Sequence, residues 1–123
     1  MAKLPNETIR TVLILQEQLL IIIDEAGAWG FIILEKHGET ETTLKDLVLL
    51  DNVRERANTY YSRFYTLLHR IVESQPTADS AILDLLQNAI LQAQATIEAL
   101  EATIKETKGD WNIPWMKIYH LHL

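Results

Sequence analysis

Residues 83–104 place apolar side chains at alternating spacings of three and four, without a break. This spacing is typical of an α-helix that buries one narrow stripe, because a helix turns once every 3.6 residues. Residues 47–71 follow the same rule, except where Arg54 interrupts the stripe and Val53 takes its place. Two such stripes predict an all-α bundle. The stripe residues are Leu47, Leu50, Ala57, Tyr61, Phe64, Leu68 and Ile71, then Leu83, Leu86, Ile90, Ala93, Ile97, Leu100 and Ile104.

Helix-ending residues divide the chain into three segments of about 30 residues each. Gly38 follows two basic residues, Pro76 follows Ser74, and Gly109 follows Lys108. Equal lengths joined by short loops predict an antiparallel up-down-up bundle over residues 1–109. The expected helix starts are Pro5 and Asn6, a cap among residues 40–43, and a Thr77 cap followed by Asp79 in the first turn. Thr43 and Asp46 also resemble a capping box with Asp in place of Glu.

The first segment is apolar around most of its circumference. One face is continuous, and further apolar residues widen it to more than half of the helix. Two partner helices cannot cover so much surface, so we expect a second protomer or the C-terminal residues to cover the rest. The expected inter-subunit residues are Ile14, Ile21, Phe31 and Ile32. The continuous face contains Val12, Leu15, Leu19, Ile22, Ile23, Ala26, Gly30 and Ile33.

Gly27 and Gly30 leave the continuity of this helix open, since each costs up to about 1 kcal/mol relative to alanine inside a helix. One interpretation is that they allow another helix or a tryptophan to approach closely. The alternative ends or kinks the helix near Ala26 and makes residues 31–34 a short strand.

Residues 110–123 form an apolar C-terminal tail that contains two of the three tryptophans, Trp111 and Trp115. Pro114 disfavours helix at the preceding residue. The tail either folds back over its own bundle, packs on a sister protomer, or binds a different protein. We expect Trp111 and Trp115 to be its anchors.

Composition limits the classes of function. The chain has no cysteine, which excludes disulfides and thiolate metal sites, and its formal net charge is −6, which disfavours general attraction to nucleic acid or anionic membranes. Charged residues interrupt the apolar stretch 12–34 well short of the roughly 20 residues that a membrane span needs. No secretory signal pattern opens the sequence, so a cytoplasmic location is expected.

No strong metal or cofactor motif is visible. The paired Glu-x-x-His motifs of di-metal bundles are missing. His120 and His122 could share one face of a strand, but no third ligand is identifiable beside them. We therefore expect no metal and no cofactor.

The second segment carries the best polar constellation. Arg56, Arg63 and Arg70 recur every seven residues, with Tyr60 close by. Arginines interleaved with aromatic residues can hold phosphates and stack bases. A solvated face whose arginines neutralise acidic neighbours is the favoured interpretation for so acidic a chain.

The stretch from Arg63 to His69 also resembles the loose Arg-x(4–6)-His pattern of the HEPN ribonucleases, small all-α domains that usually dimerise. The resemblance implies that Arg63 would steady a phosphate and that His69 would transfer protons. It covers these two residues only. Phe64 departs from the polar residue usual after the arginine, and the motif usually lies later in the chain.

The sequence as a whole favours association over chemistry. We expect a non-enzymatic interaction protein with a regulatory, adaptor or assembly role, which forms a homodimer or a higher oligomer and binds through helical surfaces and the tail.

Overall fold

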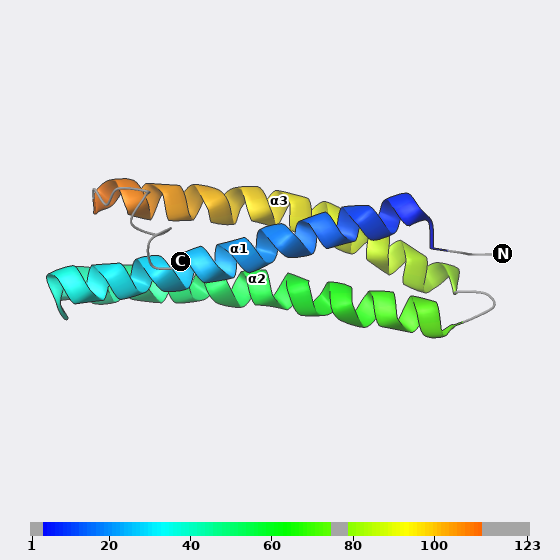
Figure 1. The fold of residues 1–123 in the computed structure, drawn as a ribbon, viewed down its shortest axis with the longest axis horizontal. Coiled ribbons are helices and arrows are strands. Elements are labelled where there is room, and N and C mark those ends of the chain that lie inside the picture. The colour runs from blue at the N-terminus through cyan, green and yellow to red at the C-terminus, as the bar shows by residue number, and fades with distance from the viewer. Residues whose placement is uncertain (1–3, 75–78, 112–123) are drawn as a thin grey trace.

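The computed structural model describes residues 4–74 and 79–111 as three long helices packed lengthwise (Figure 1). These are α1 (Asn6–His37), α2 (Glu41–Glu73) and α3 (Ser80–Asp110). Successive helices run in opposite directions, and no strand occurs among the described residues. The predicted all-α bundle of three long helices is therefore confirmed.

Burial follows the predicted stripes closely. The α3 stripe is buried from Leu86 to Ile104, and Leu83 at its start packs partly against the core. In α2, Val53 is buried while Arg54 is exposed, as the interrupted stripe predicts. Alternating three-and-four spacing is therefore enough to identify which side of α2 and of α3 faces the rest of the bundle.

α1 is continuous through both glycines, so neither a break nor a strand occurs at residues 27–34. A Cβ built on Gly30 would lie 3.2 Å from Cδ2 of Leu47 on α2. Gly30 therefore permits the close approach of a second helix. A Cβ on Gly27 would meet only Nε of Arg54, at 4.0 Å, so no such requirement applies there.

The turn between α1 and α2 is tied together by hydroxyl groups. Gly38 has a φ of 67°, which glycine adopts without strain. The Thr40 hydroxyl accepts a hydrogen bond from the Thr43 amide at 3.1 Å, and the Thr43 hydroxyl accepts one from the Thr40 amide at 2.7 Å. A cap among residues 40–43 is thus confirmed at Thr40. The predicted Thr43–Asp46 capping box is wrong, because Thr43 is the third residue of a box that Thr40 opens.

The start of α3 also differs from the prediction. Asp79 is the N-cap and not a first-turn residue, since its carboxylate accepts the Ala81 amide at 3.0 Å. Thr77, the predicted cap, lies outside the described residues. The other end of α3 extends through Gly109 to Asp110, and Trp111 occupies the C-cap position.

Candidate functional site: the outward faces of α1

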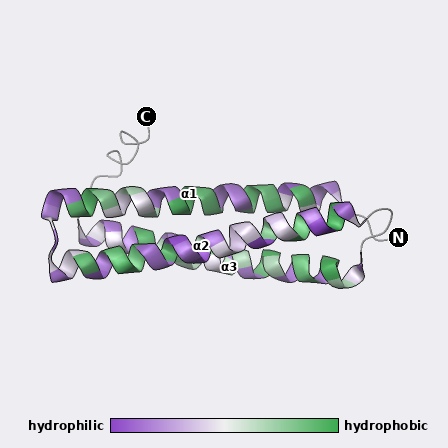
Figure 2. Cartoon of the chain, turned by 90° about the horizontal axis from the view of Figure 1, so that it is seen from below, coloured by the Kyte–Doolittle hydropathy of each residue, from purple (hydrophilic) through white to green (hydrophobic). Residues whose placement is uncertain are grey.

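The outward side of α1 carries large apolar residues at both of its edges. Ile14, Ile21 and Phe31, three of the expected interface residues, are 58 %, 48 % and 57 % exposed. Ile32 is only 6 % exposed and belongs to the core of its own chain. Its assignment to an intermolecular surface is therefore corrected. Figure 2 shows hydrophobic residues, in green, along the whole length of α1.

One edge of α1 lies beside α2. Gly27 faces Arg54, and the Gln16 amide donates to the Tyr61 carbonyl at 3.5 Å. A seven-residue repeat runs along this edge, which we call the outer seam, and Phe31 lies next to it. The outer seam consists of Leu13, Leu20, Gly27 and Leu34, whose three leucines are all exposed.

The other edge of α1 lies beside α3. Thr11, Ile14, Leu15 and Gln18 line a groove between these two helices. Ile21 follows Ile14 by seven residues and continues the same edge. A charged stripe separates the two edges on the helical wheel, again with seven-residue spacing, and it contains Arg10, Glu17 and Asp24.

Trp111 contacts its own bundle. Its indole nitrogen donates to Oδ2 of Asp46 at 2.5 Å, and its ring lies 4.6 Å from the His37 ring, centre to centre. The side chain is half-buried against the core. Trp111 is the last described residue of the tail, and it packs on its own bundle. Trp115, together with His120 and His122, lies outside the described residues.

Trp29 is a fully buried core residue that the predicted α1 face omits. The Lys108 ammonium lies 5.5 Å from the centre of its ring. The sequence does contain a pattern that predicts this burial, because Leu15, Ile22 and Trp29 recur every seven residues on one side of the helix. Trp29 therefore holds α1 to the bundle instead of serving an outside partner.

The arginine stripe runs along the exposed surface of α2. Nη1 of Arg63 lies 3.4 Å from Oε1 of Gln92 on α3, and its guanidinium lies 5.1 Å from the Tyr60 ring centre. Arg56 lines a separate cavity beside Leu100 and Thr103 of α3. The stripe is therefore partly engaged by neighbours within the chain.

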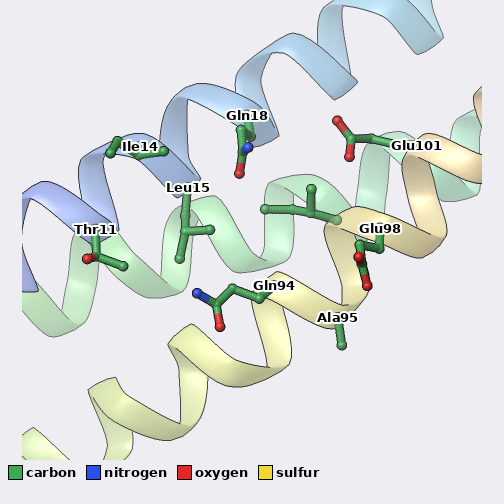
Figure 3. A pocket seen from close by; sticks show the side chains of 9 residues that line it. Thr11, Ile14, Leu15, Gln18, Gln94, Ala95, Glu98 and Glu101 are labelled. Carbon is green, nitrogen blue, oxygen red and sulfur yellow. The ribbon is translucent and has the colours of Figure 1, made fainter.

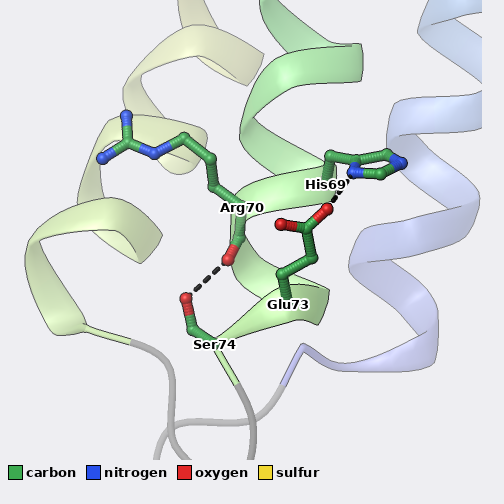
Figure 4. Close-up of polar contacts among 4 residues, drawn as sticks. All are labelled: His69, Arg70, Glu73 and Ser74. Carbon is green, nitrogen blue, oxygen red and sulfur yellow. Dashed lines mark hydrogen bonds and ion pairs between the residues drawn. The ribbon is translucent and has the colours of Figure 1, made fainter.

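The residues of the Arg-x(4–6)-His pattern make contacts in different directions. Nδ1 of His69 lies 2.6 Å from Oε1 of Glu73, and its ring lies 5.3 Å from the Tyr65 ring. Figure 4 shows His69 turned toward Glu73, with Arg70 pointing away. Arg63 lines a cavity with residues of α3, and His69 is not among its lining residues. Arg63 and His69 therefore contact different neighbours.

Among residues 4–74 and 79–111, no group of three or more His, Asp or Glu side chains is placed to hold a metal ion. None of the helices in the described part of the chain is long and apolar enough to cross a membrane. Comparisons with known protein families, with curated proteins and with solved structures found no match.

Proposed function

We propose that this protein is a non-enzymatic interaction protein that assembles with a second copy of itself through the outer seam of α1. The observation that supports the proposal is the exposure of Leu13 and Leu20, 54 % and 49 %, on a helix whose opposite side is already fully used by its own core. Large apolar side chains in a repeating row on one surface are the usual mark of a protein-binding site.

The geometry of the outer seam suits packing against another helix. Residues spaced by seven lie on one line along a helix, so Leu13, Leu20 and Leu34 can meet a facing row simultaneously. Gly27 lowers the surface between them, and nothing but the Arg54 side chain lies within 4 Å of its missing Cβ. Two copies of the same row can pack around a two-fold axis, which is the commonest symmetry of soluble oligomers.

Exposure also makes the proposal testable without damaging the fold. Leu13→Glu with Leu20→Glu would place two charges in the outer seam, while leaving every buried core residue unchanged. Leu85→Glu with Leu91→Glu is the matched control, because both leucines of α3 are as exposed and lie outside the seam. All three proteins would be compared by sedimentation equilibrium, with circular dichroism to verify that each remains helical.

We expect the wild type and the α3 control to associate with the same dissociation constant, and the seam variant to weaken association by about tenfold or more. Wild type that stays at 14.1 kDa throughout the micromolar range would contradict self-assembly. An equal loss in both variants would instead contradict the assignment to the outer seam.

A further inference from the structure

A groove of about 580 Å³ runs between α1 and α3 on the side of α1 away from the outer seam (Figure 3). α1 and α3 contact each other less extensively than either contacts α2, which leaves this junction partly open. Leu15 and Ile97, both buried, form the floor, and Ile14 and Ala95 form apolar walls. The polar lining residues are Thr11, Gln18, Gln94, Glu98 and Glu101.

The charged residues that line this groove are all acidic. Glu98 and Glu101 are exposed at its margin, and none of its nine lining residues is lysine, arginine or histidine. Figure 3 shows Gln18 and Gln94 extending into the space between the two helices, with the two glutamates farther along α3. The groove therefore has an apolar floor, an exposed isoleucine on one wall and an acidic margin.

We propose that this groove binds one α-helix of a protein partner, an amphipathic helix whose apolar stripe is flanked by lysine or arginine. A helix laid between α1 and α3 would cover Ile14, which is 58 % exposed, and would complete a fourth position of the bundle. Cations beside the apolar stripe would lie against Glu98 and Glu101. An acidic helix would meet like charge in the same place.

The length of the groove sets the size of the partner segment. Its α1 side extends from Thr11 to Gln18, about 10 Å of helix. The exposed Ile21 lies beyond the groove, on the same edge of α1. Three turns of partner helix are enough to contact the whole length of the groove. The charged stripe of α1 separates this groove from the outer seam, so the two surfaces can be tested independently.

The probe is a fluorescein-labelled synthetic helix of about 18 residues, with leucine at helical spacing and lysine on both flanks. A peptide with glutamate in place of lysine and a lysine peptide with its leucines out of register are the peptide controls. Binding is measured by fluorescence anisotropy at two salt concentrations. We expect only the first peptide to bind with a dissociation constant in the micromolar range. The other two should bind at least about tenfold more weakly.

Two glutamines of α3 provide matched protein variants. Gln94→Lys places a cation in the groove, whereas Gln92→Lys places the same cation on the side of α3 that faces Arg63. We expect Gln94→Lys to weaken binding by about tenfold or more, and Gln92→Lys to change it by less than about twofold. Equal weakening by both variants would show general attraction between a cationic peptide and an acidic protein, and would overturn the proposal.

The margin is tested by removing its charge. Glu98→Gln with Glu101→Gln should weaken binding of the lysine peptide by about threefold to tenfold and should reduce the salt dependence of that binding. Glu39→Gln with Glu106→Gln, at exposed positions outside the groove, removes the same charge and should leave binding unchanged. No difference between the two pairs would contradict the acidic margin. Sedimentation of these variants reports self-assembly separately, so a failure here is distinguishable from a failure of the outer seam.

Discussion

The indole of Trp111 donates a hydrogen bond to the Asp46 carboxylate across 65 residues of sequence, and so joins the end of α3 to the start of α2. Trp111→Phe keeps an aromatic ring beside His37 but removes the donor. A hydrogen bond to a charged acceptor contributes about 1.5–3 kcal/mol, so we expect urea denaturation to show a loss of that size. In an Asp46→Ala background the same substitution should cost much less, since the acceptor is already gone. Equal losses in both backgrounds would exclude the bond.

Thr43 is the hydroxyl on which the α1–α2 turn depends. It is buried, accepts from the Thr40 amide and donates to the Gly38 carbonyl at 2.8 Å. Thr43→Val keeps the shape but leaves both backbone groups without this partner, and should lower the free energy of unfolding by about 1–3 kcal/mol. Thr42→Val, at an exposed neighbouring position, should change it by less than about 0.5 kcal/mol. Similar results for the two valines would contradict the role of the capping box.

The two glycines of α1 should respond differently to alanine. Gly27→Ala meets no close neighbour and gains helix propensity, so we expect stabilisation approaching about 1 kcal/mol. Gly30→Ala makes the same gain but forces the Leu47 side chain to move, and should stabilise less or destabilise. Thermal unfolding at submicromolar concentration, where self-assembly contributes least, would compare the two. A larger gain at Gly30 would contradict the close contact with α2.

RNA chemistry is not expected from this arrangement. Arg63 is engaged with Tyr60 and Gln92, while His69 is engaged with Glu73, so the two side chains make contacts in different directions. Incubation with labelled single-stranded RNA should give no cleavage above buffer. Cleavage that disappears in both Arg63→Ala and His69→Ala, with helicity retained, would reverse this conclusion.

The heptad stripes allowed the fold to be predicted because burial on one side of a helix leaves a direct periodic record in sequence. The predicted α1 face, which includes Ala26 and Gly30, omits Trp29, although Trp29 is buried and continues the seven-residue repeat of Leu15 and Ile22. The Thr43–Asp46 pattern places the capping box three residues too late, because the threonines at 40, 42 and 43 all have suitable chemistry and only the backbone conformation selects Thr40.

Exposure along α1 was predicted less well than burial. Ile14 and Ile32 lie on similar sides of the helical wheel, yet one is exposed and the other buried. Packed helices cross at an angle, so one stripe meets different surroundings along its length, and a helical wheel does not contain that information. The groove between α1 and α3 depends on how far apart the two helices lie, and a helical wheel does not contain that distance either.

The most direct test of the outer seam uses single cysteines, since the chain has none of its own. Leu20→Cys lies in the seam, and Leu85→Cys is an equally exposed control on α3. Alkylation rates would be measured at low and high protein concentration. We predict that the Cys at position 20 reacts several-fold more slowly at high concentration, while the Cys at position 85 reacts at the same rate in both. An unchanged rate at position 20, under conditions where sedimentation shows assembly, would contradict the seam as the interface.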